Sequence, residues 1–392
     1  MLTLLLILIP LSGALLLLSI KNEAVIKRTA LFVSLLQLAF TLYLFFNFNN
    51  ICYCKLSLNI QWISSLGINF HIALDGISLL LVLLTNILSP IIILAGFERK
   101  QIKVKLLYAL ILLMQSALIG VFVSLNAILF YIFWELALIP IYFIVLIWGG
   151  ERRNAITLKF FIYTLLGSLF MLLAFIFLYK LTPSGSFELN EFYALNISKQ
   201  NQSLIFFFML LAFAIKMPLF PFHTWQPDTY TTAPTQGSML LSGIMLKMGI
   251  YGAIRWLLPV TPIAVAQWGN IVIIFAISGI VYASFLALKQ KDLKMLIAYS
   301  SIAHVGLMAA GIFAVNIYSL QGVIIQMFAH GIFVVGLFYV ADIIENRTNT
   351  RQIDALGGIR NKAGNFTIMF YIILLGSIAL PITNSFIGEF FL

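Results

Sequence analysis

Charged side chains are scarce in this sequence of 392 residues: Asp, Glu, Lys and Arg make up 9% of it, whereas 62% is hydrophobic. A soluble domain of this size cannot hide so much apolar surface in one core and still present a polar exterior. Apolar runs of about 20 residues, enough to cross the hydrocarbon of a bilayer, recur along the chain. The runs are continuous rather than alternating, which excludes a β-barrel. We therefore predict an all-α polytopic membrane protein.

Cysteine is almost absent, and the N-terminus has no positive stretch before its first apolar run. Cys52 and Cys54 are spaced poorly for a disulfide, and no second pair stands nearby to complete a zinc site. The missing positive stretch excludes a secretory signal and favours an uncleaved anchor with an outside N-terminus. Nucleic acid is also excluded as a partner, despite a net charge of +10. The basic residues lie in short loops between apolar runs, as membrane topology requires.

We predict twelve transmembrane spans from the apolar runs. They cover about 2–20, 29–48, 76–97, 105–123, 127–148, 155–180, 203–222, 236–258, 263–288, 294–314, 319–343 and 365–392. With the N-terminus outside, sixteen of the 23 basic residues lie on the inside and four on the outside, which follows the positive-inside rule. The last run has no polar flank before Leu392, so we expect further helices beyond it.

Six ionisable residues lie well inside separate spans: Glu135, Lys216, Lys247, His304, His330 and Glu389. A charge at a helix centre costs roughly 2.5–3.5 kcal/mol on insertion scales. Two acids, two bases and two imidazoles in separate helices are what a proton relay through a bilayer requires. Two alternatives stay open: a static buried ion pair for the four charged residues, and hydrogen-bonded packing for the two histidines.

Three further ionisable residues lie nearer to the ends of spans. We expect Lys159 to extend its ammonium group to the inside surface. Asp75 precedes a span and is expected to cap that helix. Asp342 ends a span and is expected to be solvated.

Prolines interrupt the seventh and twelfth spans. Pro218 and Pro221 follow Lys216, and Pro381 precedes Glu389. Carbonyls freed by such breaks are tolerated only where the helix faces protein or a wet cavity. The two breaks are five spans apart, an odd offset that inverts the second unit relative to the first. We therefore predict N-terminal helices 1–3 over residues 1–104, a first repeat (helices 4–8) over 105–258 and a second, inverted repeat over 259–392.

Five long segments carry a family resemblance. They are FYIFWELALIPIYF, GGERRNAITLKFFIYTLLGS, FAIKMPLFPFHTWQPDTYTTAPTQGSMLLSGIMLKMGIYG, KMLIAYSSIAHVGLM and IIQMFAHGIFVVGLFYV. In this order they resemble the antiporter-like membrane subunits of NADH:quinone oxidoreductase, respiratory complex I. Glu389, in SFIGEFF, resembles the M-type chains of that family (chain 4 in mitochondria), whereas the sister chains L and N carry lysine there. The family has fourteen spans, about two more than the twelve predicted here.

The resemblance implies proton pumping coupled to electron transfer from NADH to quinone. Glu135 and Lys216 would form an ion pair on the uptake side, and Lys216 would be the central proton carrier. Opening this pair would remove a charge that stabilises the lysine and would drive its proton onward.

The same resemblance implies roles for the other four buried residues. Lys247, with His304 and His330 around it, would link two half-channels. Glu389 would release protons outward or act on the neighbouring subunit.

Cofactors and partners follow from the same resemblance. No flavin, iron–sulfur, nucleotide or quinone motif occurs in this chain, so NADH, FMN, iron–sulfur clusters and quinone are expected in partner subunits. The partners would be the antiporter-like chains L and N and the small membrane chains. All would lie in the bacterial cytoplasmic membrane or the mitochondrial inner membrane. Three other functions stay open: a subunit of an Mrp-type cation/proton antiporter, a hydrogenase-linked membrane subunit and a purely structural scaffold.

Overall fold

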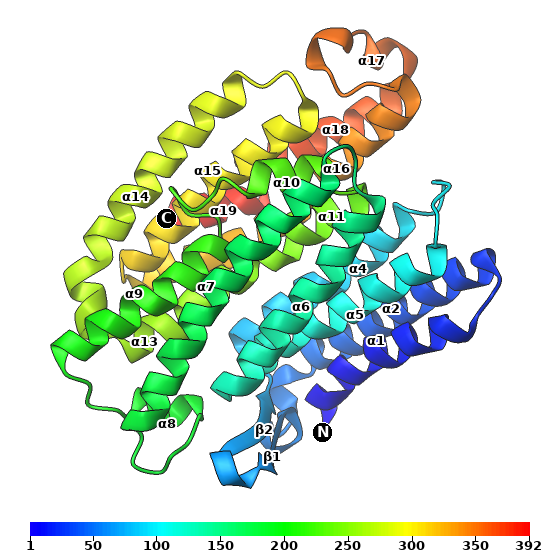
Figure 1. Cartoon of the computed structure of the whole chain (residues 1–392). Helices are drawn as coiled ribbons and strands as arrows, with labels where there is room; N and C mark the ends of the chain where they lie inside the picture. Colours follow the sequence, from blue (N-terminus) through cyan, green and yellow to red (C-terminus); the bar gives the residue numbers. More distant parts are fainter.

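The computed structural model describes residues 1–392 and is a bundle of helices with one small hairpin (Figure 1). Ten helices are long and apolar enough to cross a membrane, in agreement with the predicted all-α polytopic class. They are α1 (Leu2–Ser19), α2 (Glu23–Phe46), α4 (Gly76–Leu94), α5 (Val104–Val123), α6 (Ala127–Trp148), α7 (Arg153–Leu181), the composite helix Thr235–Val260, α14 (Pro262–Leu288), α15 (Leu293–Phe313) and α16 (Ile317–Thr348). Short elements in the loops are α8 (Leu189–Tyr193), α17 (Ile359–Lys362) and the 3-10 turns Phe48–Asn50 and Ile353–Ala355.

The two spans that were predicted to break near prolines are broken. α9 (Lys199–Lys216) ends at Lys216, and a segment of turns leads to the short helix α10 (Gln226–Thr232). α18 (Gly364–Ser377) is likewise separated from α19 (Asn384–Phe391). Proline lacks an N–H group and clashes with the carbonyl one turn earlier, which favours a break. Proline alone does not force one here, since Pro10, Pro90 and Pro140 lie inside the continuous helices α1, α4 and α6. These breaks explain why ten full-length helices stand where twelve apolar runs were counted.

The composite helix Thr235–Val260 is irregular, which was not predicted. α11 (Thr235–Leu240) passes into a π-helical turn, Leu241–Met245, and then into α12 (Leu246–Gly252); a second π turn, Ala253–Leu257, precedes α13 (Leu258–Val260). Such wide turns are rare and often lie at functional sites.

The composite helix is also the most enclosed part of the bundle. In its most apolar stretch 94% of the residues are buried, compared with 22% in α14, which lies at the edge of the bundle (Figure 1). Ionisable side chains on the composite helix must therefore find their partners within the protein, because buried polar groups need hydrogen bonds.

The two ends of the bundle differ in charge. The loops 98–105, 149–154, 289–294 and 345–362 hold most of the basic residues outside the helices, and we call their end of the bundle the basic face. It is the predicted inside. The hairpin and α8 lie at the opposite end (Figure 1).

The hairpin was not predicted. β1 (Ser57–Ile63) and β2 (Ile68–Ala73) pair antiparallel through a 3-10 turn, Ser64–Leu66, and Gly67 with φ 63°. The alternation of polar and apolar residues in SLNIQWI was the missed signal. Glycine is required at this turn, because a Cβ on Gly67 would lie 2.0 Å from the carbonyl oxygen of Gly185.

The expectation that the two cysteines form no disulfide was wrong: the structure joins Cys52 to Cys54. Cys52 caps the short helix α3 (Tyr53–Leu56), whose turn places the two Cα atoms 5.3 Å apart. That separation is within the range that a disulfide requires.

Candidate functional site

The six predicted site residues fall into two groups. The first consists of Glu135 on α6 and Lys216 at the end of α9. The second consists of Lys247 on α12, His330 on α16, His304 on α15 and Glu389 on α19. In the second group, neighbouring members lie in polar contact or have adjacent rings.

Lys216 is the last residue of α9, directly before the first break (residues 217–225), and it forms no ion pair. The residue is 2% exposed, and its Nζ lies 5.3 Å from the centroid of the Trp134 ring, a distance typical of a cation–π interaction. As the last residue of α9 it also lies at the negative end of the helix dipole. Its Nζ has no hydrogen-bond partner in the protein.

Glu135 follows Trp134 on α6, yet no ion pair of 4.0 Å or less joins it to Lys216. Its Oε1 is likewise buried without a hydrogen-bond partner. The structure therefore brings Lys216 to the ring of Trp134, the residue before Glu135, but does not form the ion pair that the resemblance implied.

The backbone of the first break is satisfied by local contacts. Trp225 donates its indole N–H to the carbonyl oxygen of Ile215 at 3.0 Å, and the amide of Leu219 donates to Ala214 at 2.8 Å. α12 lies directly against this break at Gly249, where a Cβ would come within 2.8 Å of backbone atoms of Met217 and Phe213. The helix that carries Lys247 thus touches the segment that follows Lys216.

Lys247 and His330 form a direct buried contact. Both side chains are 0% exposed, and Lys247 Nζ lies 2.9 Å from His330 Nδ1. Nζ also donates to the carbonyl oxygen of Ser242, in the first π turn, at 2.8 Å. On the far side of the ring, His330 Nε2 lies 3.1 Å from Ser301 Oγ. When the ammonium donates to Nδ1, the imidazole is left with its proton on Nε2, which donates to Ser301.

His304 lies between His330 and the second break, which covers residues 378–383. Its Nδ1 lies 2.8 Å from the carbonyl oxygen of Ser300 and its Nε2 lies 3.0 Å from that of Ser377, the last residue of α18. Carbonyl oxygens only accept, so only an imidazolium can donate to both. Glu389 Oε1 lies 3.6 Å from Nε2 and accepts from Gln326 Nε2 at 3.1 Å. The rings of His304 and His330 have centroids 5.8 Å apart.

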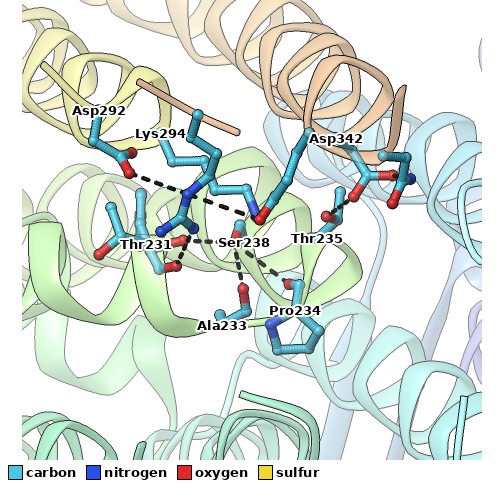
Figure 2. Close-up of polar contacts among 12 residues, drawn as sticks. Thr231, Ala233, Pro234, Thr235, Ser238, Asp292, Lys294 and Asp342 are labelled. Carbon is cyan, nitrogen blue, oxygen red and sulfur yellow. Dashed lines mark hydrogen bonds and ion pairs between the residues drawn. The ribbon is translucent and has the colours of Figure 1, made fainter. Parts of the chain in front are cut away.

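A separate polar cluster lies at the basic face (Figure 2). Asp342 on α16 is 2% exposed and accepts from the Arg99 guanidinium, from the Thr235 hydroxyl and, at 3.1 Å, from Asn346 Nδ2. The expectation that Asp342 is solvated was therefore wrong. Arg99 and Thr235 are 243 and 107 residues away in sequence, so no local pattern could have indicated them.

Arg351 forms the other half of this cluster. Its guanidinium lies 3.0 Å from Asp292 Oδ2 and donates to the carbonyl oxygen of Thr231, in α10, at 3.2 Å. Nearby, Lys294 Nζ lies 3.1 Å from Glu345 Oε2. The short helix of the first break is thereby attached to α15 and α16.

Asp75 and Lys159 are the other two residues that we placed near the ends of spans, and both have partners in the protein. Asp75 caps α4 as predicted, accepting from Ser78 N at 3.0 Å, and also pairs with Arg255. Lys159 is partly exposed, but its Nζ does not end in solvent alone. It donates to the carbonyl oxygen of Thr224 at 2.8 Å and lies 3.0 Å from Asp228 Oδ2.

The chain is similar to known membrane subunits over most of its length. The family described as "NADH:quinone oxidoreductase/Mrp antiporter, TM" matches residues 124–392. The protein therefore belongs to this family of antiporter-like membrane subunits.

Within the family, the chain is similar to subunit M. It is 43% identical over 331 residues to "NADH-quinone oxidoreductase subunit M" of Rickettsia prowazekii (strain Madrid E), covering 84% of this chain and 67% of that protein. It is 37% identical over 389 residues to "NADH-ubiquinone oxidoreductase chain 4" of Marchantia polymorpha, covering 98% and 78%.

Solved structures show the same architecture. A chain of respiratory complex I from Thermus thermophilus with bound NADH matches with a TM-score of 0.91 and 28% identity, covering 100% of this chain and 81% of that one. A chain of the Mrp complex from Dietzia sp. DQ12-45-1b has a TM-score of 0.88 at 20% identity, covering 99% and 42%. The Mrp likeness shows the fold alone.

Proposed function

We propose that this chain is an M-type proton-translocating membrane-arm subunit of an NADH:quinone oxidoreductase. The observation that carries the proposal is the series of ionisable side chains from Lys247 through His330 and His304 to Glu389, in an otherwise apolar interior. Lys247 contacts His330, the rings of His330 and His304 are neighbours, and His304 Nε2 lies 3.6 Å from Glu389 Oε1. Static ion pairing does not account for two imidazoles placed between a lysine and a carboxylate.

Lys216 is the proposed proton carrier of the first break. The Trp134 ring and the end of α9 stabilise its charged form, while no hydrogen bond holds its proton in place. A proton can therefore leave the ammonium group without the loss of a hydrogen bond to the protein. Glu135 sets the charge next to this lysine and, in our proposal, moves into contact with it during the cycle.

The second group carries the proton onward. The doubly protonated His304 ring first releases its Nε2 proton to the Glu389 carboxylate, whose Oε1 lies 3.6 Å away. Transfer from the Lys247 ammonium to His330 Nδ1 then leaves a neutral amine. His330 gives its Nε2 proton to the Ser301 hydroxyl, which passes its own proton to the now neutral His304 ring. Each step moves one proton between named atoms, which is general acid–base chemistry.

We further propose that residues 105–258 and 259–392 are the two inverted repeats, each with its own broken helix. NADH, FMN, the iron–sulfur clusters and quinone are assigned to partner subunits, together with chains L and N and the small membrane chains. Subunits of this kind come from bacteria and from mitochondria, as the relatives illustrate. The membrane is accordingly the bacterial cytoplasmic membrane or the mitochondrial inner membrane.

The test is Lys216→Ala in membrane vesicles whose inside surface faces outward. We expect the complex to assemble, as judged on a native gel, and both NADH oxidation and NADH-driven proton uptake to collapse. The matched control is Lys291→Ala, which removes a lysine whose side chain is 78% exposed. Unchanged activities at the normal ratio would make Lys216 a structural residue. Sodium-driven proton exchange without any NADH-driven uptake would instead favour an Mrp-type antiporter.

A further inference from the structure

The composite helix Thr235–Val260 and α16 run antiparallel and touch at three levels. Near the basic face, the Thr235 hydroxyl donates to Asp342 (Figure 2). At the centre, Lys247 contacts His330. Twelve residues separate the two contacts on each helix, so a single register satisfies both.

Between these levels the helices approach closely. A Cβ on Gly243 would lie 2.4 Å from Val335 Cγ2, and one on Gly331 would lie 3.0 Å from the carbonyl oxygen of Gly243. Because glycine has no side chain, the helices approach closely here and Val335 packs against Gly243. The directional contacts between the two helices are the polar ones at the two ends.

Asp342 fixes the position of α16 relative to the composite helix at the basic face. Its buried carboxylate receives donors from three different elements: Arg99 in the loop before α5, Thr235 at the start of α11 and Asn346 on α16 itself. A buried carboxylate is tolerated only with such partners, and removing one is costly. The three donors hold Asp342 in one place relative to the composite helix.

From this geometry we propose that Asp342 and Thr235 are positioning residues for the Lys247–His330 contact. The proposal rests on the proton-transfer role assigned to that contact above. One residue of slip along a helix is a shift of about 1.5 Å. A change of register by one residue also turns the side chains by about 100°, which takes Lys247 Nζ and His330 Nδ1, now 2.9 Å apart, out of hydrogen-bond range.

The contact between Thr235 and Asp342 also links the first break to the second group of site residues. Only Ala233 and Pro234 separate α10 from α11. Ser238 Oγ donates back across this junction to the carbonyl oxygen of Tyr230 at 2.6 Å. A displacement of α10 is therefore passed to Thr235, and through Asp342 to α16, the helix of His330.

The experiment compares Thr235→Val, which removes the hydroxyl at nearly constant shape, with Thr235→Ser, which retains it. Two quantities are measured on the assembled complex: the initial rate of NADH-driven proton uptake in vesicles, and amide hydrogen exchange over 235–247 in the purified complex. We expect Thr235→Val to slow uptake about tenfold or more, since a displacement of about 1 Å can cost 10²-fold. We also expect roughly tenfold faster exchange, because a buried carboxylate loses a donor. Thr235→Ser should restore both.

The control is Asp354→Asn, which removes a carboxylate from the same face that is 75% exposed and pairs only with Lys291, at 3.8 Å. Both quantities should stay at the wild-type value. Faster exchange with normal uptake in Thr235→Val would overturn the positioning role, and so would failure of Thr235→Val and Thr235→Ala to assemble while Thr235→Ser assembles. The exchange measurement is independent of pumping. If the proposed function is wrong, uptake will be insensitive to Lys216→Ala while the exchange result still reports on the Asp342 contact.

Discussion

The two buried lysines differ in how the protein satisfies them. Lys247 has a hydrogen bond to a carbonyl oxygen and a contact with an imidazole, whereas Lys216 has neither and faces an aromatic ring. Removing the Lys247 ammonium leaves the buried His330 Nδ1 without its partner, at a cost of about 1–3 kcal/mol. Removing the Lys216 ammonium leaves no protein group unpaired. Lys216 is therefore the residue at which function can be removed with the least effect on stability.

His304 offers a test of proton transfer that leaves its hydrogen bonding largely in place. In His304→Gln the amide can still donate to the carbonyl oxygen of Ser300 or Ser377 but cannot carry a proton through. A positioned proton-transfer group contributes about 10²–10⁴-fold, so we expect NADH-driven uptake to fall at least about tenfold in the assembled complex. The measurement is the initial uptake rate per assembled complex. Normal uptake in His304→Gln would reduce His304 to a packing residue.

The broken helices place side chains where a continuous helix could not. The break after α18 leaves the carbonyl of Ser377 free to bond His304, and the break after α9 ends the helix at Lys216. Prolines near ionisable residues inside spans indicated both breaks from sequence, whereas Pro10, Pro90 and Pro140 lie inside continuous helices. The π turns of the composite helix follow from packing against other helices and have no such local cause, which is why sequence analysis did not predict them.

Contact between the first break and α12 depends on Gly249. In Gly249→Ala the new Cβ would lie 2.8 Å from the amide nitrogen of Met217 and the carbonyl oxygen of Phe213. Backbone atoms cannot rotate away as a side chain can, so α12 must shift. Overpacking of this kind costs typically about 1–3 kcal/mol. We expect a lower midpoint of thermal dissociation for the purified complex and slower NADH-driven uptake.

Gly364→Ala is the matched control for this substitution, since nothing lies within 4 Å of the position of its Cβ. It should leave the thermal midpoint within error of the wild type. Equal midpoints for the two variants would show that α12 and the break are not in the tight contact described.

At the scale of the whole molecule, the sequence predicted what depends on local pattern. Apolar length gave the spans, prolines gave the breaks, and the cost of buried charge selected the six site residues. Long-range partners were not predictable: Asp342 looked like a solvated helix end because Arg99 and Thr235 are far away in sequence. The same reason applies to His71, whose Nδ1 lies 2.5 Å from Glu188 Oε2 across 117 residues and attaches the hairpin to the loop before α8.

The orientation of the molecule in the membrane is a prediction from charge, and single-cysteine labelling tests it. The two cysteines of this sequence are paired with each other, and labelling is scored as the gain over the same chain without an introduced cysteine. Ser64→Cys lies in the exposed hairpin turn and Gly357→Cys in the exposed loop after α16, at opposite ends of the bundle (Figure 1). Because basic loops stay on the inside, we expect a membrane-impermeant maleimide added outside to intact cells or mitoplasts to label Ser64→Cys and not Gly357→Cys.

The reverse result must hold in vesicles whose inside surface faces outward, where Gly357→Cys should react and Ser64→Cys should not. Detergent provides the control, since both positions should then label equally. Labelling of Gly357→Cys from the outside of intact cells or mitoplasts would invert the topology. It would also place the Arg99–Asp342 cluster at the face of proton release, so that the uptake side assigned to Lys216 would have to be exchanged with it.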